Sequence, residues 1–348
     1  MLTLEHDRLV VRFPEIHPDA TCTIEFQRTL RIPDDNRTHG LPPGLGRFPL
    51  KHVDDYAGRL PAAWQKRGGV FFPMHETEAM WLNFHSDYPF AVKIATGKIN
   101  AVTGDAWTPE LKGPSSMDAL LRSMPAAAGH YGPRDSGAKQ DYVVLPDQPW
   151  LDGYCVGEGQ IRQFVAMPQV SGYSVEEQLT GEALHGGLQI IVYPLKPDFY
   201  QPRLAVSGMM FACASASADM ESCESFPEMG LAAGGLMYQT VHEDEYGLAK
   251  WDQSTNAKCF VHLLNSKQYE YVTGEAPPTP VPSAADYTTA GLPWFMEVGD
   301  APALPGAPKL QQVDSVGTLA IKKGESVLPV EAPLPEVTNV IAVPISKV

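Results

Sequence analysis

Basic residues are scarce in this sequence. Its 348 residues include 26 lysines and arginines against 41 aspartates and glutamates, which gives a formal net charge of −15, and no run of basic residues occurs. A nucleic-acid-binding protein needs a basic face that displaces counterions from the phosphates. We therefore expect no nucleic-acid partner.

Long apolar runs are also missing. The longest stretches, such as residues 188–195, are far shorter than the roughly 20 residues that a membrane-spanning helix needs. Residues 1–19 mix acidic residues and histidines with apolar ones, whereas a signal peptide has a basic start and a continuous apolar segment. We therefore predict a cytoplasmic protein that does not insert into a membrane.

Cysteine is rare and irregularly spaced. The five cysteines include no CxxC pair, and their number is odd. We expect reduced and mostly buried thiols, with a Cys213–Cys223 disulfide as the main alternative.

The common catalytic signatures do not occur. The sequence contains no GxxxxGK[ST], no GxSxG and no HExxH motif. The glycines in Gly230–Gly235 lack the spacing of a dinucleotide-binding loop, so we attribute them to close backbone packing. We can name neither a catalytic nor a cofactor-binding residue, and this favours a protein that is not an enzyme.

Proline and glycine are abundant, with 32 and 30 residues that separate short apolar runs. This pattern favours strands and turns over long helices. The clearest strand is Cys22–Ile32, where apolar and polar residues alternate; only Arg28 falls on the apolar side, as a strand bend or as an ion pair at the core edge. Further strands are expected at Val70–Phe72, Ala79–Phe84, Phe90–Ala95, Tyr142–Leu145, Ile161–Met167, Leu188–Tyr193, Ala205–Phe211, Cys259–Leu264 and Tyr269–Val272.

Short helices are expected at 62–67, at 116–124 and at 175–180, the last after a Ser174–Glu177 capping box. The predicted fold is mainly β, with antiparallel β-sandwich-like lobes and a few short helices. We divide the chain into an N-terminal β region (1–104), a loop and helix insertion (105–140), a second β region (141–295) and a Pro-rich C-terminal arm (296–348). Within the arm, Val337–Val343 is apolar enough to dock as a strand on the body or on a neighbouring subunit.

Two acidic segments contain histidine and are candidate sites for a divalent metal such as Ca²⁺ or Zn²⁺. The first contains His75, Glu76 and Glu78. In an extended segment His75 points away from the two glutamates, so a polar loop is the simpler interpretation. The second contains His242, Glu243 and Asp244 and lacks EF-hand spacing. A solvated acidic loop, a Ca²⁺ site and a docking surface all fit it.

Other side chains allow simpler interpretations. His262 lies between Val261 and Leu263 and is interpreted as a hydrogen-bonded core histidine. The six tryptophans are spread along the chain, and we interpret them mainly as anchors of loops to the β core. Exposed tryptophans beside carboxylates would instead suit a sugar or peptide ligand.

The segments LPPGLGRFPL (41–50), QPWLDG (148–153), IRQFVAMP (161–168) and EEQLTGEALHGG (176–187) resemble a family of uncharacterised microbial proteins. Some members are labelled integral membrane proteins, which does not fit the short apolar runs here. The resemblance covers most of residues 10–295. It implies one recurring body with a more variable tail, and it supplies no activity or catalytic residue.

These observations lead to one expectation and two alternatives. We expect a non-enzymatic binding or assembly protein with a protein partner or a second copy of itself. The alternatives are a metal-dependent enzyme that uses the acidic segments, and a carbohydrate-binding module or other small-molecule binder that uses the tryptophans.

Overall fold

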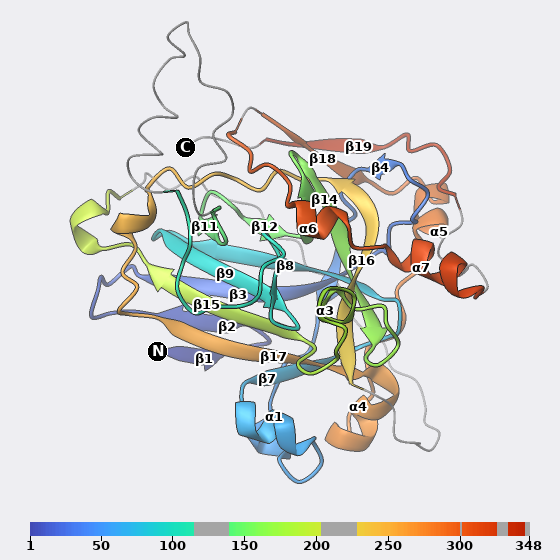
Figure 1. Cartoon of the computed structure of the whole chain (residues 1–348), viewed down its shortest axis with the longest axis horizontal. Helices are drawn as coiled ribbons and strands as arrows, with labels where there is room; N and C mark the ends of the chain where they lie inside the picture. The colour runs from blue at the N-terminus through green and yellow to red at the C-terminus, as the bar shows by residue number, and fades with distance from the viewer. Residues whose placement is uncertain (115–138, 203–227, 300, 326–332, 345–348) are drawn as a thin grey trace, which may run out of the picture.

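The computed structural model describes residues 1–114, 139–202, 228–299, 301–325 and 333–344. The described part is mainly β, as predicted, with one large sheet, a separate two-stranded ribbon and a few short helices (Figure 1). The strands of the large sheet are β1 (Leu2–Leu4), β2 (Leu9–Arg12), β3 (Thr21–Thr29), β4 (Thr38–His39), β5 (Gly44–Arg47), β6 (Lys51–His52), β7 (Val70–Met74), β8 (Ala79–Ser86), β9 (Phe90–Thr96), β10 (Ile99–Asn100), β11 (Val143–Leu145), β12 (Trp150–Leu151), β13 (Gly153–Gly157), β14 (Gln160–Pro168), β15 (Leu188–Pro194), β16 (Met229–Tyr238) and β17 (Ala257–Asn265). The ribbon consists of β18 (Trp294–Val298) and β19 (Val340–Pro344).

Short helices accompany this sheet. They are α1 (Ala62–Arg67), α3 (Val175–Thr180), α4 (Ser266–Thr273), α5 (Ala284–Thr289), α6 (Pro308–Gln311) and α7 (Val316–Lys323). In Figure 1, α1 and α4 lie at one end of the molecule beside β7 and β17, and the β18–β19 ribbon lies at the opposite end. No helix among the described residues is long and apolar enough to span a membrane.

The large sheet contains two antiparallel runs. In one run β2, β3, β8, β14 and β16 pair in that order, and in the other β17, β15, β9 and β11 do so. Within the described ranges, a single residue pair, Met229 of β16 with Leu263 of β17, connects the two runs. Strands of the two predicted β regions therefore pair directly: β8 with β14, and β9 with β15.

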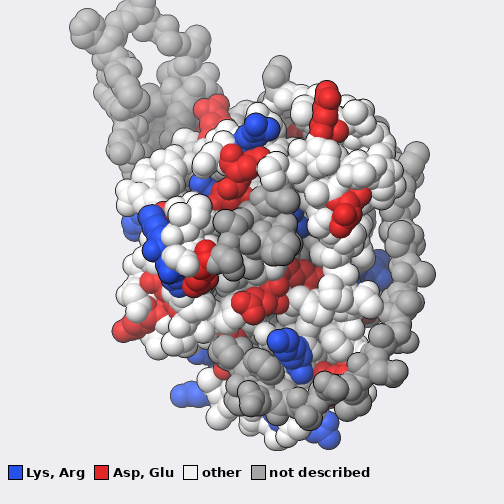
Figure 2. Space-filling model, turned by 90° about the vertical axis from the view of Figure 1, so that its right-hand side faces the viewer, with Lys and Arg blue, Asp and Glu red and all other residues white. Residues whose placement is uncertain are grey.

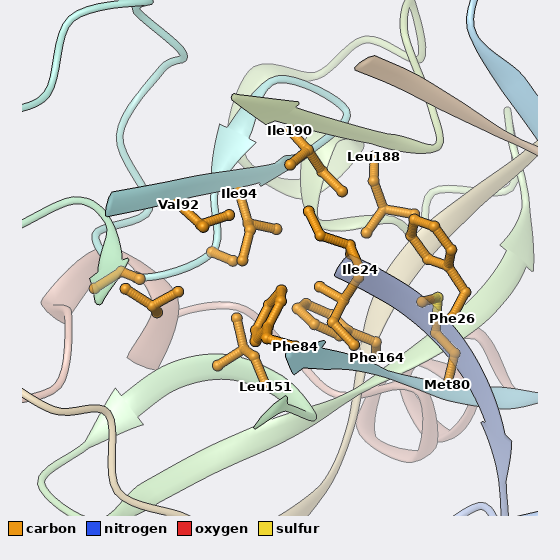
Figure 3. Close-up of a cluster of buried hydrophobic side chains, with 14 of the residues drawn as sticks. Ile24, Phe26, Met80, Phe84, Val92, Ile94, Leu151, Phe164, Leu188 and Ile190 are labelled. Carbon is orange, nitrogen blue, oxygen red and sulfur yellow. The ribbon is translucent and has the colours of Figure 1, made fainter. Parts of the chain in front are cut away.

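The core lies between these two runs. Figure 3 shows Ile24 and Phe26 of β3 and Phe84 of β8 pointing toward Ile94 of β9 and Ile190 of β15. All are buried, since alternate side chains of each strand point to one side of the sheet. The fully buried apolar area between the runs is the main source of folding free energy.

Most predicted elements are confirmed. The helices at 62–67 and 175–180 have the expected bounds, and the Ser174–Glu177 capping box forms. Cys22, Cys155 and Cys259 are buried free thiols. The predicted helix at 116–124, the strand at Ala205–Phe211, and Cys213 and Cys223 lie outside the described residues.

One predicted strand is wrong. Residues 269–272 belong to helix α4. The side chain of Asn265 caps the helix by accepting a hydrogen bond from the Lys267 amide, and Gly274 ends it in the left-handed conformation. These end signals outweigh the β propensity of the Tyr and Val between them.

The C-terminal arm contacts the rest of the protein at two places. Ser315 forms a β-bridge with Ala233 of β16 and begins helix α7. Further along, β19 pairs in parallel with β18, whose Phe295 exchanges two backbone hydrogen bonds with Leu41. The segment predicted to dock as a strand therefore does so on β18.

Candidate functional site

The first acidic segment forms the turn between β7 and β8. The left-handed φ of 68° at Thr77 tightens this turn. One carboxylate oxygen of Glu78 accepts hydrogen bonds from Nε and Nη2 of Arg28 at 2.8 and 2.6 Å, and the other accepts the backbone amide of His75. The His75 ring nitrogen lies 2.8 Å from the carbonyl oxygen of Pro278, and Glu76 is exposed to solvent. The three predicted metal ligands thus have separate environments.

The second acidic segment is tied to the body by side chains from another region. Asp244 accepts hydrogen bonds from the Tyr142 hydroxyl at 2.6 Å and from the Trp251 indole at 2.8 Å. His242 is buried, and this burial lowers its pKa. The backbone amide of Glu243 donates to the carbonyl oxygen of Pro302. Asp244 is therefore a hydrogen-bond acceptor that orders two buried aromatic side chains.

Three buried glutamines hold the same segment. Gln140 and Gln148 donate to the carbonyl oxygens of His242 and Thr240, and they accept the amides of Asp244 and His242. Gln239, at the start of this segment, bonds Asp152 in two ways. Its side-chain oxygen accepts the Asp152 backbone amide, and its side-chain amide donates to the Asp152 carboxyl group at 2.6 Å. Residues 239–244 are thereby fixed by glutamines that the sequence analysis did not single out.

Among the residues that the structure describes, no group of three or more His, Cys, Asp or Glu side chains is placed to hold a metal ion. Metal binding by His75, Glu76 and Glu78, or by His242, Glu243 and Asp244, stays a prediction that this geometry does not favour.

The tryptophans divide into two groups. Trp64, Trp251 and Trp294 are buried, as expected for loop anchors. The others, Trp81, Trp107 and Trp150, are half-buried. Charged groups of both signs are interspersed with uncharged surface on the face that Figure 2 shows.

Two of the half-buried tryptophans lie on the outer face of the large sheet. Asn83 of β8 pairs with Glu25 on one side and with Trp150 on the other, and Trp81 lies two residues along β8. Glu25 accepts hydrogen bonds from Asn83, Gln27 and Arg47. Planar polar groups and indole rings therefore share one face of the sheet.

Two further carboxyl groups, those of Asp152 and Glu297, were not identified from the sequence. Asp152, between β12 and β13, is 3% exposed, and Glu297 of β18 accepts the Thr240 amide at 2.8 Å. The pKa of Asp152 is raised to about 8, mainly by burial and to a smaller extent by the charge of Glu297. Burial also raises the pKa of Glu297 to about 7. The two residues lie far apart in sequence, and no motif connects them.

Comparison with protein-family models, curated proteins and solved structures finds no match to this chain. The resemblance to a microbial family stays a prediction, and a functional assignment depends on the geometry described above.

Proposed function

We propose that this is a non-enzymatic assembly protein and that the outer face of the β18–β19 ribbon contacts a second copy of the chain. The proposal depends on the register of the ribbon. Because paired residues of neighbouring strands lie on one face, Trp294, Met296 and Val298 of β18 share a face with Val340, Ala342 and Pro344 of β19. Trp294 is buried against Tyr287 and Thr288 of α5, so the exposed part of this outer face consists of the other five residues. All five are apolar and exposed, and the three largest are 41–49% exposed.

An apolar face of this kind favours a partner. Soluble proteins rarely leave a continuous apolar patch in water unless it binds something. A two-stranded ribbon is also marginally stable in isolation, so an additional strand or covering surface stabilises it. The inner face carries Phe295, which packs on the core, and Glu297.

The edge of the ribbon adds a second feature. Among the described residues, β19 pairs only with β18, which leaves its other edge without a neighbouring strand. An open edge offers backbone donors and acceptors to another strand. Two copies related by a two-fold axis satisfy each other's edges with the same residues.

Charge favours a second copy over a charged partner. The chain has a formal net charge of −15, so two copies repel each other over most approaches. The outer face of the ribbon contains no charged side chain, and contact there brings no like charges together directly. A basic partner would find no carboxylate on this face to pair with.

The oligomeric state in solution tests the proposal. We expect size-exclusion chromatography with light scattering to give twice the chain mass at micromolar concentration. The double variant Val298→Lys/Val340→Lys should be monomeric, because it adds two charges per copy to the contact. Ile321→Lys is the matched control, since Ile321 is an exposed apolar residue on α7, outside the ribbon. A wild-type chain that is monomeric at all concentrations would falsify the proposal.

Carbohydrate binding is the second candidate function, favoured by the outer face of β3, β8 and β12. Indole rings stack on sugar rings, while planar amides and carboxylates bind hydroxyl groups. Trp81 and Trp150 flank Asn83 on this face, beside the hydrogen-bonded Glu25 and Gln27. A glycan array followed by calorimetry of any hit tests this candidate. Binding that survives in Trp150→Ala would place the ligand elsewhere.

A further inference from the structure

A lysine and an aspartate meet inside the protein where β9 lies beside β11. Val92 of β9 pairs with Val143 of β11, and Lys93 and Asp141 lie close to this pair on the two segments. The Lys93 Nζ atom lies 2.6 Å from Asp141 Oδ2, and the two side chains are 1% and 6% exposed. An amine and a carboxyl group are therefore held at hydrogen-bond distance with almost no access for water.

Neighbouring groups hold the amine in one orientation. Besides its contact with Asp141, Nζ donates to the carbonyl oxygen of Glu110 at 2.6 Å and to the Thr108 hydroxyl at 3.3 Å. The ring centroid of Trp107 lies 5.6 Å from the same atom. Because the amine is already fixed beside the carboxyl group, a reaction between the two loses little further freedom of motion.

The carboxyl group is polarised from its other side. Asp141 Oδ1 accepts the backbone amide of Lys112 at 2.9 Å, while Oδ2 faces the amine. When an amine adds to a carboxyl carbon, negative charge develops on the oxygen that stays, and a fixed N–H donor stabilises this charge. The Lys112 amide occupies the position of such a donor. Burial also raises the pKa of Asp141, which favours the protonation that makes Oδ2 a leaving group.

Exclusion of water distinguishes this pair from the other lysine–carboxylate pairs of the described residues. Three of these also have N–O distances of 2.5–2.6 Å, but their side chains are 23–60% exposed: Lys51–Glu275, Lys309–Asp105 and Lys322–Asp314. Water solvates both charges of such exposed pairs and hydrolyses any amide that forms. At Lys93 and Asp141 the two charges have lost that solvation, and a released water molecule has little reason to return.

We propose that Lys93 and Asp141 condense to form an amide bond between their side chains. The Lys93 ammonium first gives a proton to Asp141 Oδ2 over their hydrogen bond, which leaves a neutral amine and a carboxylic acid. The nitrogen lone pair then forms a bond to Asp141 Cγ. A second proton passes from nitrogen to Oδ2, the Cγ–Oδ2 bond breaks, and Oδ2 leaves as one water molecule. The reaction consumes no co-reactant and takes up or releases no net proton.

The product keeps the contacts of the site. The amide oxygen, which was Oδ1, still accepts the Lys112 backbone amide, and the remaining N–H still donates to the Glu110 carbonyl oxygen. No buried charge remains to be compensated. The bond joins β9 to the residue that precedes Tyr142 and closes the predicted insertion (105–140) at its base. This inference is independent of the contact between copies.

Mass spectrometry of the purified full-length chain, denatured before measurement, tests the proposal. Loss of one water molecule lowers the mass by about 18 Da relative to the sequence. After trypsin digestion we expect residues 68–98, uncleaved after Lys93, to be joined to residues 140–162, with fragment ions that place the link at Lys93 and Asp141. A wild-type chain with the full sequence mass overturns the proposal, and this result does not depend on any variant.

Two variants identify the reacting amine. Lys93→Arg keeps the charge but replaces the amine with a guanidinium group, which is a poor nucleophile, so this variant should have its full sequence mass. Lys309→Arg is the matched control at the exposed pair with Asp105, and it should keep the deficit of the wild type. A deficit that persists in Lys93→Arg, or that fragment ions confine to residues 140–162 as a cyclised aspartate, overturns the proposal.

Discussion

Arg28 and Glu78 form a buried ion pair in which one carboxylate oxygen accepts both Nε and Nη2 of the guanidinium group. The side chains are 10% and 3% exposed. Nη2 also donates to the carbonyl oxygen of Thr279, and the second Glu78 oxygen accepts the His75 amide. The pair is therefore hydrogen-bonded on both sides, and Arg28 fastens Thr279 to the end of β3.

Glu78→Gln should destabilise the protein by about 3–5 kcal/mol, because removal of one partner leaves the Arg28 charge buried without compensation. The midpoint and slope of urea unfolding measure this change. Glu76→Gln is the control: Glu76 lies two residues away and is exposed, so we expect a change within about 0.5 kcal/mol. Equal effects of the two substitutions would show that the ion pair does not contribute as described.

Local patterns predicted much of the fold. The alternation over Cys22–Ile32 identified β3, although the strand ends at Thr29, and the Ser174–Glu177 spacing identified α3 with its bounds. Both signals lie within a few residues of the chain, where periodicity and capping act. Arg28 is the exception in the alternation, and it forms an ion pair with Glu78, which is one of the two interpretations that the pattern allowed.

Contacts between distant residues could not be predicted in this way. Glu78 and Asp244 looked like metal ligands because they stand beside histidines, but their partners are Arg28 and Tyr142 from other strands or loops. Asp152 and Glu297 are held by Gln239 and Thr240, which directly follow β16 in the chain. Such contacts follow from strand order, and a single sequence does not determine strand order.

Glu176 tests how much a buried carboxylate contributes to stability when it accepts hydrogen bonds from backbone amides. It is buried in α3 and accepts the amides of Leu184, His185 and Gly186 at 2.8–3.0 Å. In Glu176→Gln, one carboxylate oxygen becomes an NH₂ group that faces a donor. We expect a loss of about 1–3 kcal/mol, as for a buried group left unpaired, and faster hydrogen exchange at residues 184–186. Glu182→Gln, an exposed glutamate of the same loop, should leave both unchanged.

A substitution of Asp244 tests whether this residue is a structural hydrogen-bond acceptor or a metal ligand. Asp244→Ala deprives the Tyr142 hydroxyl and the Trp251 indole of their acceptor, so we expect a loss of about 2–4 kcal/mol with no change in bound metal. Urea unfolding and elemental analysis of protein purified without chelator measure the two quantities. Stoichiometric metal in the wild-type chain that disappears in this variant would restore Asp244 as a ligand. Glu245→Gln, an exposed neighbour, is the control.

The environment of His262 leads to a prediction of how the free energy of unfolding changes at acidic pH. It is buried in β17, its ring stacks on Trp64 with centroids 4.3 Å apart, and a ring nitrogen lies 3.1 Å from the carbonyl oxygen of Gly68. Burial lowers its pKa to about 4. The folded chain thus disfavours the charged imidazole, and the neutral ring contributes stability above about pH 6.5 that is lost as the pH falls toward 4.

The size of this acid effect follows from the pKa difference. A shift from 6.5 to about 4 corresponds to about 3 kcal/mol across that interval. His262→Gln should be less stable than the wild type at pH 7.5, because it loses the stacked ring, yet its stability should fall less between pH 6.5 and 4.5. Urea unfolding at four pH values gives the change of stability with pH for the wild type and for His262→Gln. His52→Gln is the control, because His52 is exposed. The wild-type chain also contains His185 and His242, whose pKa values burial lowers, so the decisive quantity is the difference between the wild-type and His262→Gln slopes. Parallel curves would mean that protonation of His262 does not oppose folding.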